Sequence, residues 1–392
     1  MRDAYDVVIV GGAVHGASVA YHLAADPGFD GRVLLVEKDP SFCFAATTLS
    51  CGSIRQQFST PVNIAVSLYG IEFLRLVGER LAVDAERPDV ALREGGYLFL
   101  ATPGGAATLA RNHAVQTRLG ADILHLDAER LAAQFPWLST EGIAAGAWGR
   151  TGEGWFDGFS LMQAFRRKAR SLGVEPLTGE AVAVERADGR ATGVRLADGA
   201  RIEAGHVVIA AGTGTATLAG TAGFALPVEA RKRMVFTFAC RGPLRGVPLI
   251  VDPSGVYVRP EGELFICGSA PPPDRDPLAT DFEVDHSFFE ETIWPVLATR
   301  VPAFENIKPG RAWAGHYDMN LFDHNAIVGP LPDLANLLVA TGFSGHGLQQ
   351  APAIGRGLAE LIVHGRYRSL DLSPLGYERI AANRPLVEEN VV

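Results

Sequence analysis

The stretch DVVIVGGAVHGASVAYHLA, residues 6–24, decides the fold. Residues 6–10 form an apolar run that predicts a central parallel strand, and the small residues after the glycine turn at 11–16 predict a helix. A second apolar run, residues 33–36, ends on Glu37. Strand, glycine turn, helix, strand and an acid about 20 residues further on are the order of the dinucleotide-binding βαβ unit.

Each part of this unit has a chemical role. The glycines let the backbone approach a pyrophosphate, and the helix N-terminus offers it N–H groups and a positive dipole end. Glu37 is placed to accept a hydrogen bond from a ribose hydroxyl. Ala13 stands where the pattern has its second glycine, and a methyl fits there if Ala13 keeps a negative φ. The stretch therefore predicts a bound adenine dinucleotide.

Composition and charge narrow the possible functions. The chain has 392 residues, 47% hydrophobic and 20% charged, which is ordinary for a globular protein with room for two cores. Its net charge of −9 disfavours a general attraction to nucleic acid or to an anionic membrane. No uncharged apolar run reaches about 18 residues, so no membrane span is expected. Residues 1–6 lead straight into the first strand and leave no room for a cleaved signal peptide, so we expect a cytoplasmic protein.

The cysteines give no sign of a metal site or a disulfide framework. Cys43, Cys51, Cys240 and Cys267 are scattered, without CxxC spacing or a companion histidine cluster. We expect them to be buried small hydrophobes.

Apolar runs typical of a doubly wound parallel sheet occur at three separated places, residues 5–37, 206–212 and 336–341. Short alternating runs within residues 226–320 are typical of an antiparallel sheet. The predicted fold is α/β, a discontinuous Rossmann-type nucleotide-binding domain with an inserted, mainly antiparallel cap domain, and a ligand pocket between them. We expect the nucleotide domain to comprise residues 1–88, 153–225 and 322–392, and the cap domain 89–152 and 226–321.

Local signals set several element boundaries. Residues 63–81 have apolar residues at helical spacing and predict one helix with a buried stripe. The last helix is expected to begin near Pro352, because proline is favoured in a first turn. The dipeptides at 188–189 and 198–199, both Asp-Gly, predict hairpin turns.

Four stretches together resemble the FAD-dependent D-amino acid oxidase superfamily, in the branch of sarcosine oxidase, glycine oxidase and D-amino acid dehydrogenases. They are residues 7–37, 49–55, 207–212, and 336–347 with the helix that follows. The sequence GFSGHG at 342–347 is the most specific piece and looks much like the sarcosine oxidase pattern. The run SIRQQFS at 53–59, with YDMN at 317–320, also resembles a subgroup of uncharacterised relatives linked to respiratory-chain assembly.

The resemblance implies an FAD extended over the Rossmann-type domain, with its isoalloxazine at the boundary with the cap. Residues 46–52 would pass beneath the ring, Val182 would meet the adenine, and the side chain of His15 is expected to point outward. The expected cofactor-binding residues are Gly11, Gly12, Ala13, Val14, His15, Gly16, Glu37, Lys38, Ala46, Thr47, Thr48, Ser50, Cys51, Gly52, Val182, Ala211, Gly212, Gly342, Phe343, Ser344, Gly345, His346, Gly347, Leu348 and Gln349.

The FAD is expected to be non-covalent. Some relatives attach their flavin through a cysteine just before a tyrosine near position 315, but this chain reads Gly315-His316-Tyr317 there. Others use a histidine after the ribose acid, and residues 38–60 contain no histidine.

By resemblance, the reaction is oxidation of the C–N bond of a small amino acid, with hydride transfer to flavin N5. Tyr257 and Tyr317 match pocket positions of relatives, and D-amino acid dehydrogenases carry a carboxylate-binding arginine where this chain has Tyr317. Secondary amines such as sarcosine or an iminodiacid are therefore the first choice of substrate. Arg55, Arg233 or Arg259 would have to bind the carboxylate. The expected catalytic residues are Arg55, Tyr257, Arg259, Tyr317 and His346.

Several alternatives stay open. The strand at 265–268 lacks the lysine that assists oxygen in sarcosine oxidase-like enzymes, which favours a dehydrogenase over an oxidase. The chain is alternatively a D-amino acid or 2-hydroxy acid dehydrogenase, or a flavoprotein assembly or interaction factor with vestigial catalysis. The expected partner is a small amino acid or amine, with no nucleic acid and no integral membrane segment, in a monomer or a homodimer.

Overall fold

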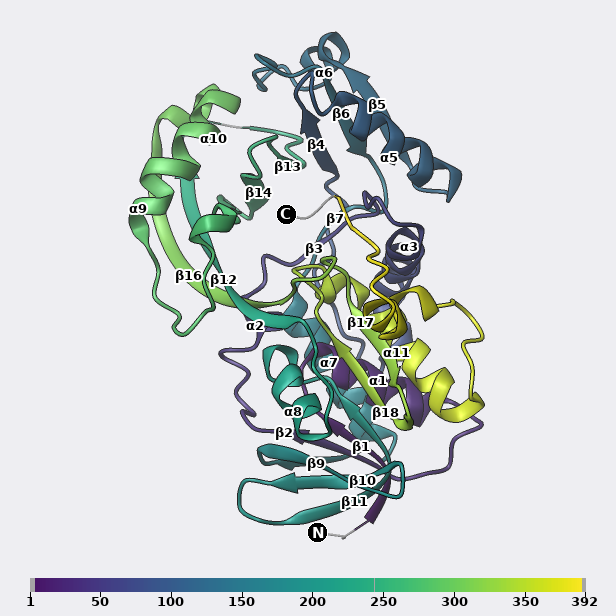
Figure 1. Ribbon diagram of the computed structural model, residues 1–392. Coiled ribbons are helices and arrows are strands. Elements are labelled where there is room, and N and C mark those ends of the chain that lie inside the picture. Colours follow the sequence, from purple (N-terminus) through teal and green to yellow (C-terminus); the bar gives the residue numbers. More distant parts are fainter. Residues whose placement is uncertain (1–3, 243, 390–392) are drawn as a thin grey trace.

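The computed structural model describes residues 4–242 and 244–389, whose strands form two eight-stranded sheets and one sheet of two strands (Figure 1). The first sheet has the order β17-β18-β11-β1-β2-β8, and its strands from β18 to β8 are parallel. An antiparallel hairpin, β9 and β10, extends from β11. The bounds are β1 (Ala4–Val10), β2 (Val33–Glu37), β8 (Glu175–Thr178), β9 (Ala181–Ala187), β10 (Arg190–Leu196), β11 (Arg201–Ile209), β17 (Ile327–Leu331) and β18 (Leu334–Thr341).

The first sheet is buried on both faces, which is why its strands read as continuous apolar runs. Along β1, Val7 and Ile9 enter one core, whereas Val8 and Val10 enter the other. The first core is completed by the helices α1 (Val14–Ala25), α3 (Pro61–Arg75), α7 (Gly158–Ser171) and α11 (Gly347–His364). The second core is covered by the β9–β10 hairpin and α8 (Thr215–Thr221).

The second sheet has the order β16-β12-β15-β14-β13-β4-β6-β5 and is antiparallel except where β13 pairs with β4. Its strands are β4 (Tyr97–Ala101), β5 (Ile123–Asp127), β6 (Ala145–Gly149), β12 (Val228–Cys240), β13 (Leu249–Val251), β14 (Tyr257–Glu261), β15 (Leu264–Ser269) and β16 (Ile307–Asn320). The helices that follow these strands are α5 (Ala106–Arg118), α6 (Ala128–Gln134), α9 (His286–Phe288), the π-helical turn η3 (Phe289–Ile293) and α10 (Trp294–Arg300). The predicted α/β class, with a discontinuous Rossmann-type sheet and an inserted antiparallel sheet, is confirmed.

Short elements complete the fold. The two-stranded sheet pairs β3 (Ser53–Ile54) with β7 (Gly154–Trp155), and both lie between the larger sheets in Figure 1. The remaining helical turns are α2 (Ala46–Leu49), α4 (Val77–Arg80), η1 (Gly212–Gly214), η2 (Pro273–Arg275), η4 (Pro302–Glu305), η5 (Ser373–Leu375) and α12 (Glu378–Ala381). Within the described part of the chain, no helix is both long and apolar enough to cross a membrane.

The long strands β12 and β16 join the two sheets. At one end Cys240 pairs with Ile307 in the second sheet, and at the other Val228 pairs with Asn320. The side chain of Val228 belongs to the core of the first sheet. Figure 1 shows the two strands descending together from the second sheet toward the first. Residues 315–320 are therefore carried to the junction of the sheets.

Two predicted helix boundaries are wrong. The segment 63–81 is divided at Leu76, which leaves helical geometry with φ −104° and ψ 10°. One periodic pattern fitted both parts because Phe73, Val77 and Leu81 stay buried across the break. The last helix begins at Gly347, five residues before Pro352, because the glycine turn ends at Gly345 and the chain becomes helical immediately after it.

Close packing of α1 on α11 depends on a glycine, Gly355, at the contact between the two helices. Ser18 Oγ donates a hydrogen bond to Ala351 O over 2.7 Å, and a Cβ on Gly355 would lie 2.1 Å from the same Oγ. We expect Gly355→Ala to lower the free energy of unfolding by about 1–3 kcal/mol through overpacking. Gly220 in α8 has open space around its Cα, so Gly220→Ala is a matched control that should be neutral or stabilising by up to about 1 kcal/mol. Urea unfolding compares the two variants, and equal effects would contradict the packing argument.

Candidate active site

A cleft of about 1210 Å³ lies at the junction of the sheets. The β1–α1 turn and the end of β2 line one side, and β12, β16 and the β18–α11 loop line the other. Sites for small molecules usually occupy about 300–1000 Å³, so this cleft has room for an extended dinucleotide. It reaches from Glu37 on β2 to Tyr317 on β16.

The β1–α1 turn has the geometry that a pyrophosphate needs. A Cβ on Gly16 would lie 1.8 Å from Gly11 O, so the helix and the strand touch through backbone alone. Gly11 has a φ of +101°, which favours glycine. Ala13 keeps a φ of −72°, which confirms that a methyl is tolerated there. Among the described residues no side chain caps the N-terminus of α1, and Ala13, Val14 and His15 at this end line the cleft, as an anion site requires.

Glu37 is held in a fixed orientation at the end of β2. Its Oε2 accepts a hydrogen bond from Gly12 N over 2.7 Å, and its Oε1 accepts one from Asp39 N over 2.8 Å. Arg166 of α7 steadies the same turn by donating to Gly12 O over 3.1 Å. The carboxylate therefore faces the cleft in the place where the βαβ unit binds a ribose.

A second group of candidate residues surrounds the guanidinium of Arg55, which is not part of the described cleft lining. This side chain is only 2% exposed, and its Cζ lies 4.0 Å from the centre of the Phe58 ring, 5.2 Å from Phe99 and 6.0 Å from Tyr97. His346 packs edge-on against Phe58, with ring centres 5.1 Å apart. Arg55 and His346 therefore share one aromatic wall in a region from which water is excluded.

The two tyrosines of the site are neutral hydrogen-bonding groups. Burial raises the pKa of Tyr317 to about 12, although the charges of Arg233 and Arg55 act in the opposite direction. Burial and the nearby thiol of Cys51 raise the pKa of Tyr257 well above its ordinary value. Burial and the charge of Arg55 together lower the pKa of His346 well below its ordinary value, so this imidazole is neutral as well.

The other two candidate arginines are engaged in structural contacts. Arg233 makes a two-pronged ion pair with Asp276, with N–O distances of 2.8 and 2.9 Å. Arg259 donates through Nε to Cys51 O over 3.0 Å and also bonds to Glu261. Tyr257 and Arg259 share a strand face, as predicted, but the arginine ties the backbone of the Cys51 segment to the second sheet.

The residues that follow β3 are held by side chains from distant parts of the chain. Arg55 N donates to Gln349 Oε1 of α11 over 2.8 Å. Gln56 N and Gln57 N both donate to Glu153 Oε1, over 2.5 and 3.2 Å, and Gln57 Nε2 donates to Glu153 Oε2 over 2.7 Å. The pairing of β3 with β7 brings Glu153 to this position. The loop thus has a fixed shape without belonging to a helix or a strand.

Comparison with known proteins agrees with this geometry. A family model described as "FAD dependent oxidoreductase" matches residues 6–361. The chain belongs to this family. It is 42% identical to "FAD-dependent oxidoreductase domain-containing protein 1" of Xenopus laevis, over 99% of this chain and 85% of that protein. It is also 27% identical to sarcosine oxidase subunit beta of Rhizobium meliloti, over 92% of this chain and 85% of that protein. The structure matches that of L-proline dehydrogenase from P. horikoshii with a TM-score of 0.86, 25% identity and coverage of 98% and 100%.

The predicted resemblance to the D-amino acid oxidase superfamily and the predicted FAD cofactor are thereby confirmed. Among the residues expected to bind FAD, those that line the cleft are Gly11, Ala13, Val14, His15, Glu37, Lys38, Ala46, Thr47, Ser50, Val182, Ala211, Gly212, Phe343, Gly345, Gly347 and Leu348. The described lining does not include Gly12, Gly16, Thr48, Cys51, Gly52, Gly342, Ser344, His346 and Gln349. All of these assignments to FAD remain predictions.

The expected outward orientation of His15 is wrong. Its ring stacks on that of Phe343, with centres 3.8 Å apart and planes at 13°. The ring lies there because Gly347 leaves room, since a Cβ on Gly347 would lie 2.8 Å from His15 Cε1. Burial lowers the pKa of His15 to about 3, so the imidazole is neutral. This contact closes the β1–α1 turn against the β18–α11 loop inside the cleft.

Asp318 is a cleft residue to which sequence reasoning gave no role. Its Oδ2 accepts a hydrogen bond from Gly342 N over 2.8 Å and lies 3.4 Å from Thr341 Oγ1. Burial raises its pKa to about 6. The carboxylate therefore fixes the start of the glycine-rich loop to β16. The only signal in the sequence was an acid placed directly after Tyr317.

Glu153 gives the site a dependence on pH. Burial raises the pKa of this carboxyl from 4.5 to about 7. Between pH 4.5 and pH 7 the carboxyl of Glu153 is ionised in the unfolded chain but still protonated in the folded protein. Rising pH therefore lowers the free energy of unfolding of the wild type, by up to roughly 3 kcal/mol in total. Glu153→Gln has no proton to lose at this position and should not show this loss. Urea unfolding of both proteins between pH 4.5 and pH 8 measures this difference. A constant difference over that range would contradict the assignment.

Proposed function

We propose that this protein oxidises the C–N bond of a small amino acid, preferably one whose nitrogen is a secondary amine. The substrate loses a hydride from Cα and a proton from nitrogen to give an imine, which water hydrolyses to an oxo acid and an amine. FAD, when bound, supplies the acceptor for the hydride, and its electrons pass to O2 or to another acceptor. The observation that carries this proposal is the buried Arg55 in its aromatic wall.

Arg55 is the residue to which we assign the substrate carboxylate. A guanidinium makes two-pronged contacts with a carboxylate, and such contacts are strong where water is excluded. Arg233 forms an ion pair with Asp276, and Arg259 contacts both the Cys51 backbone and the Glu261 carboxylate. The guanidinium of Arg55 also donates a hydrogen bond, but to a neutral backbone carbonyl, that of Gln57. The Phe58 ring, which contacts both the Arg55 guanidinium and His346, places Arg55 near other candidate residues and supports the assignment.

The neighbouring residues suit an amine oxidation that needs little acid–base chemistry. Tyr257 and Tyr317 are neutral phenols that can orient the amine, and the neutral His346 adds no positive charge that would repel it. Buried aromatic side chains exclude water and hold the substrate in one orientation. These residues therefore bind and orient the substrate.

The choice of a secondary amine is supported by the arginine that is missing at Tyr317. Two of the similar proteins are named for secondary-amine substrates, sarcosine and L-proline. The binding of FAD without a covalent bond is part of the same proposal, because position 315 is glycine and not cysteine.

An anaerobic substrate panel tests the proposed function. Purified protein should release its FAD on acid precipitation, and the intact holoprotein is mixed with sarcosine, iminodiacetate, L-proline, D-alanine and lactate. We expect sarcosine-type amines to remove the visible absorbance of the flavin. Reduction by lactate alone would show that a different bond is oxidised, and no reduction by any compound would favour the vestigial alternative.

Replacement of Arg55 tests its role in substrate binding. Loss of a charge-assisted hydrogen bond in a dry pocket costs about 1.5–3 kcal/mol, so Arg55→Ala should raise the half-saturating substrate concentration by roughly one to two orders of magnitude. Arg55→Lys should recover only part of the affinity, because a point charge cannot make the two-pronged contact. Exposed Arg130→Ala is the control. Unchanged half-saturation with normal FAD content in both Arg55 variants would exclude the role.

A further inference from the structure

A buried glutamate from the C-terminal tail, residues 383–389, reaches the loop that contains Arg55. Glu388 is 1% exposed, although its neighbours Val387 and Glu389 are exposed. Its Oε1 accepts hydrogen bonds from Ser59 N and Ser59 Oγ, both over 2.7 Å. Its Oε2 accepts from Thr60 N over 3.2 Å, from Thr60 Oγ1 over 2.9 Å and from Asn63 Nδ2 over 3.1 Å.

This carboxylate sits at the N-terminus of α3, whose first residue is Pro61. Burial of a charged group is costly unless hydrogen bonds compensate for the lost water. The backbone N–H groups, the two hydroxyls and the helix dipole provide that compensation. The donors around Glu388 therefore stabilise a negative charge at a buried position.

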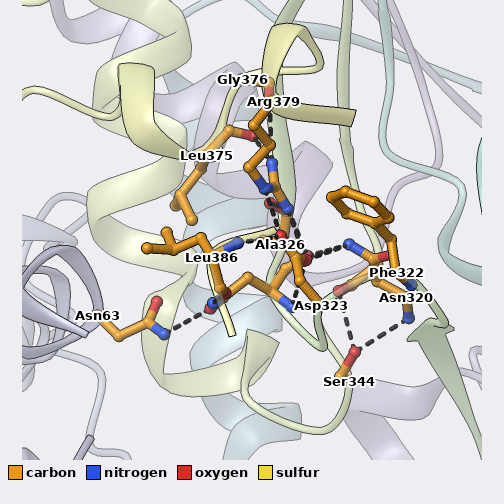
Figure 2. A network of polar contacts seen from close by, with 12 residues as sticks. Asn63, Asn320, Phe322, Asp323, Ala326, Ser344, Leu375, Gly376, Arg379 and Leu386 are labelled. Carbon is orange, nitrogen blue, oxygen red and sulfur yellow. Dashed lines mark hydrogen bonds and ion pairs between the residues drawn. The ribbon is translucent and has the colours of Figure 1, made fainter. Parts of the chain in front are cut away.

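A polar network holds the tail in place before it reaches Glu388 (Figure 2). Arg379 of α12 binds Asp323 with N–O distances of 2.7 and 3.0 Å. Asp323 Oδ2 also accepts a hydrogen bond from Leu386 N over 3.0 Å. The side chain of Asn325 accepts from Asn63 Nδ2 over 2.6 Å, which ties the network to α3. In Figure 1 the yellow C-terminal segment rises toward α3 and β7.

The loop connects Glu388 to the candidate substrate site. Ser59 and Thr60 directly follow Phe58, which is fully buried. One face of the Phe58 ring lies 4.0 Å from Arg55 Cζ, and the same ring meets the edge of His346. Glu153 binds the backbone before Phe58, and Glu388 binds the backbone after it. The ring under Arg55 is thus fixed from both sides.

We infer that Glu388 is a positioning residue for the substrate site, which it shapes by holding Phe58 and, through it, the guanidinium of Arg55. The inference rests on the proposed function, because it takes Arg55 as the carboxylate-binding residue. The inference also means that the C-terminal tail, although distant in sequence from the glycine turn, helps to shape the substrate site. A role limited to capping α3 would affect stability without affecting substrate affinity.

Two variants one residue apart test the inference. Glu388→Gln keeps the shape of the side chain but removes its charge, and Glu389→Gln does the same at an exposed neighbour. For the amine of the panel that best reduces the flavin, Glu388→Gln should raise the half-saturating concentration by about five- to tenfold. FAD content and the limiting rate of reduction should change by less than about twofold, and Glu389→Gln should resemble the wild type. Amides of residues 56–60 should exchange hydrogen faster in Glu388→Gln only.

If the two variants have equal half-saturating amine concentrations while Glu388→Gln has a lower free energy of unfolding, Glu388 acts only as a helix cap. That result would overturn the inference. If Glu388→Gln does not fold, Thr60→Val, which removes one donor to the carboxylate, should give a rise of about two- to threefold, and no rise would again overturn it. Wild-type protein that no amine reduces would instead overturn the proposed function. Unchanged hydrogen exchange at residues 56–60 in Glu388→Gln would then overturn the coupling on its own.

Discussion

The site depends on one constraint, the need of an irregular buried loop to satisfy its own backbone N–H groups. Residues 55–60 belong to no helix and no strand, yet they lie where the two large sheets meet. Phe58 N donates to Gln56 O within the loop. The other five N–H groups donate to the side chains of Gln349, Glu153 and Glu388, which come from three different parts of the chain. An unpaired buried N–H is costly, so these side chains select a single loop shape. That shape places Arg55 over Phe58.

The two sheets contribute to the site in different ways. The parallel sheet supplies the backbone of the glycine turn and the carboxylate of Glu37, the two features by which this unit binds a dinucleotide. The antiparallel sheet supplies side chains, among them Tyr257, Phe99 and Tyr317. Because β12 and β16 pass from one sheet to the other, they connect the cleft directly to the antiparallel sheet.

Sequence alone predicted the parts of the site that depend on local pattern. The turn at residues 11–16 and Glu37 are encoded within a short stretch, and the structure has the turn and the acid in that arrangement. The roles of Glu153 and Glu388 were not predicted, because their partners are distant in sequence. Glu153 binds Gln56, 97 positions away, and Glu388 binds Ser59, 329 positions away. An isolated acid in a sequence gives no sign of its partner. The prediction for the His15 side chain was wrong for the same reason, because its orientation depends on the space left by Gly347, which is distant in sequence.

The order of strands in the first sheet has a consequence for how the chain is made. The N-terminal strand β1 lies between β2 and β11, and Val7 pairs with His206, while Val207 pairs with Leu337. During synthesis β1 can pair early with β2 but must wait for its second neighbour until the hairpin before β11 has emerged. Contacts so distant in sequence slow folding and leave strand edges open to wrong partners. Because the cleft lining extends to Leu348, the chain completes this cleft only after most of it has been synthesised.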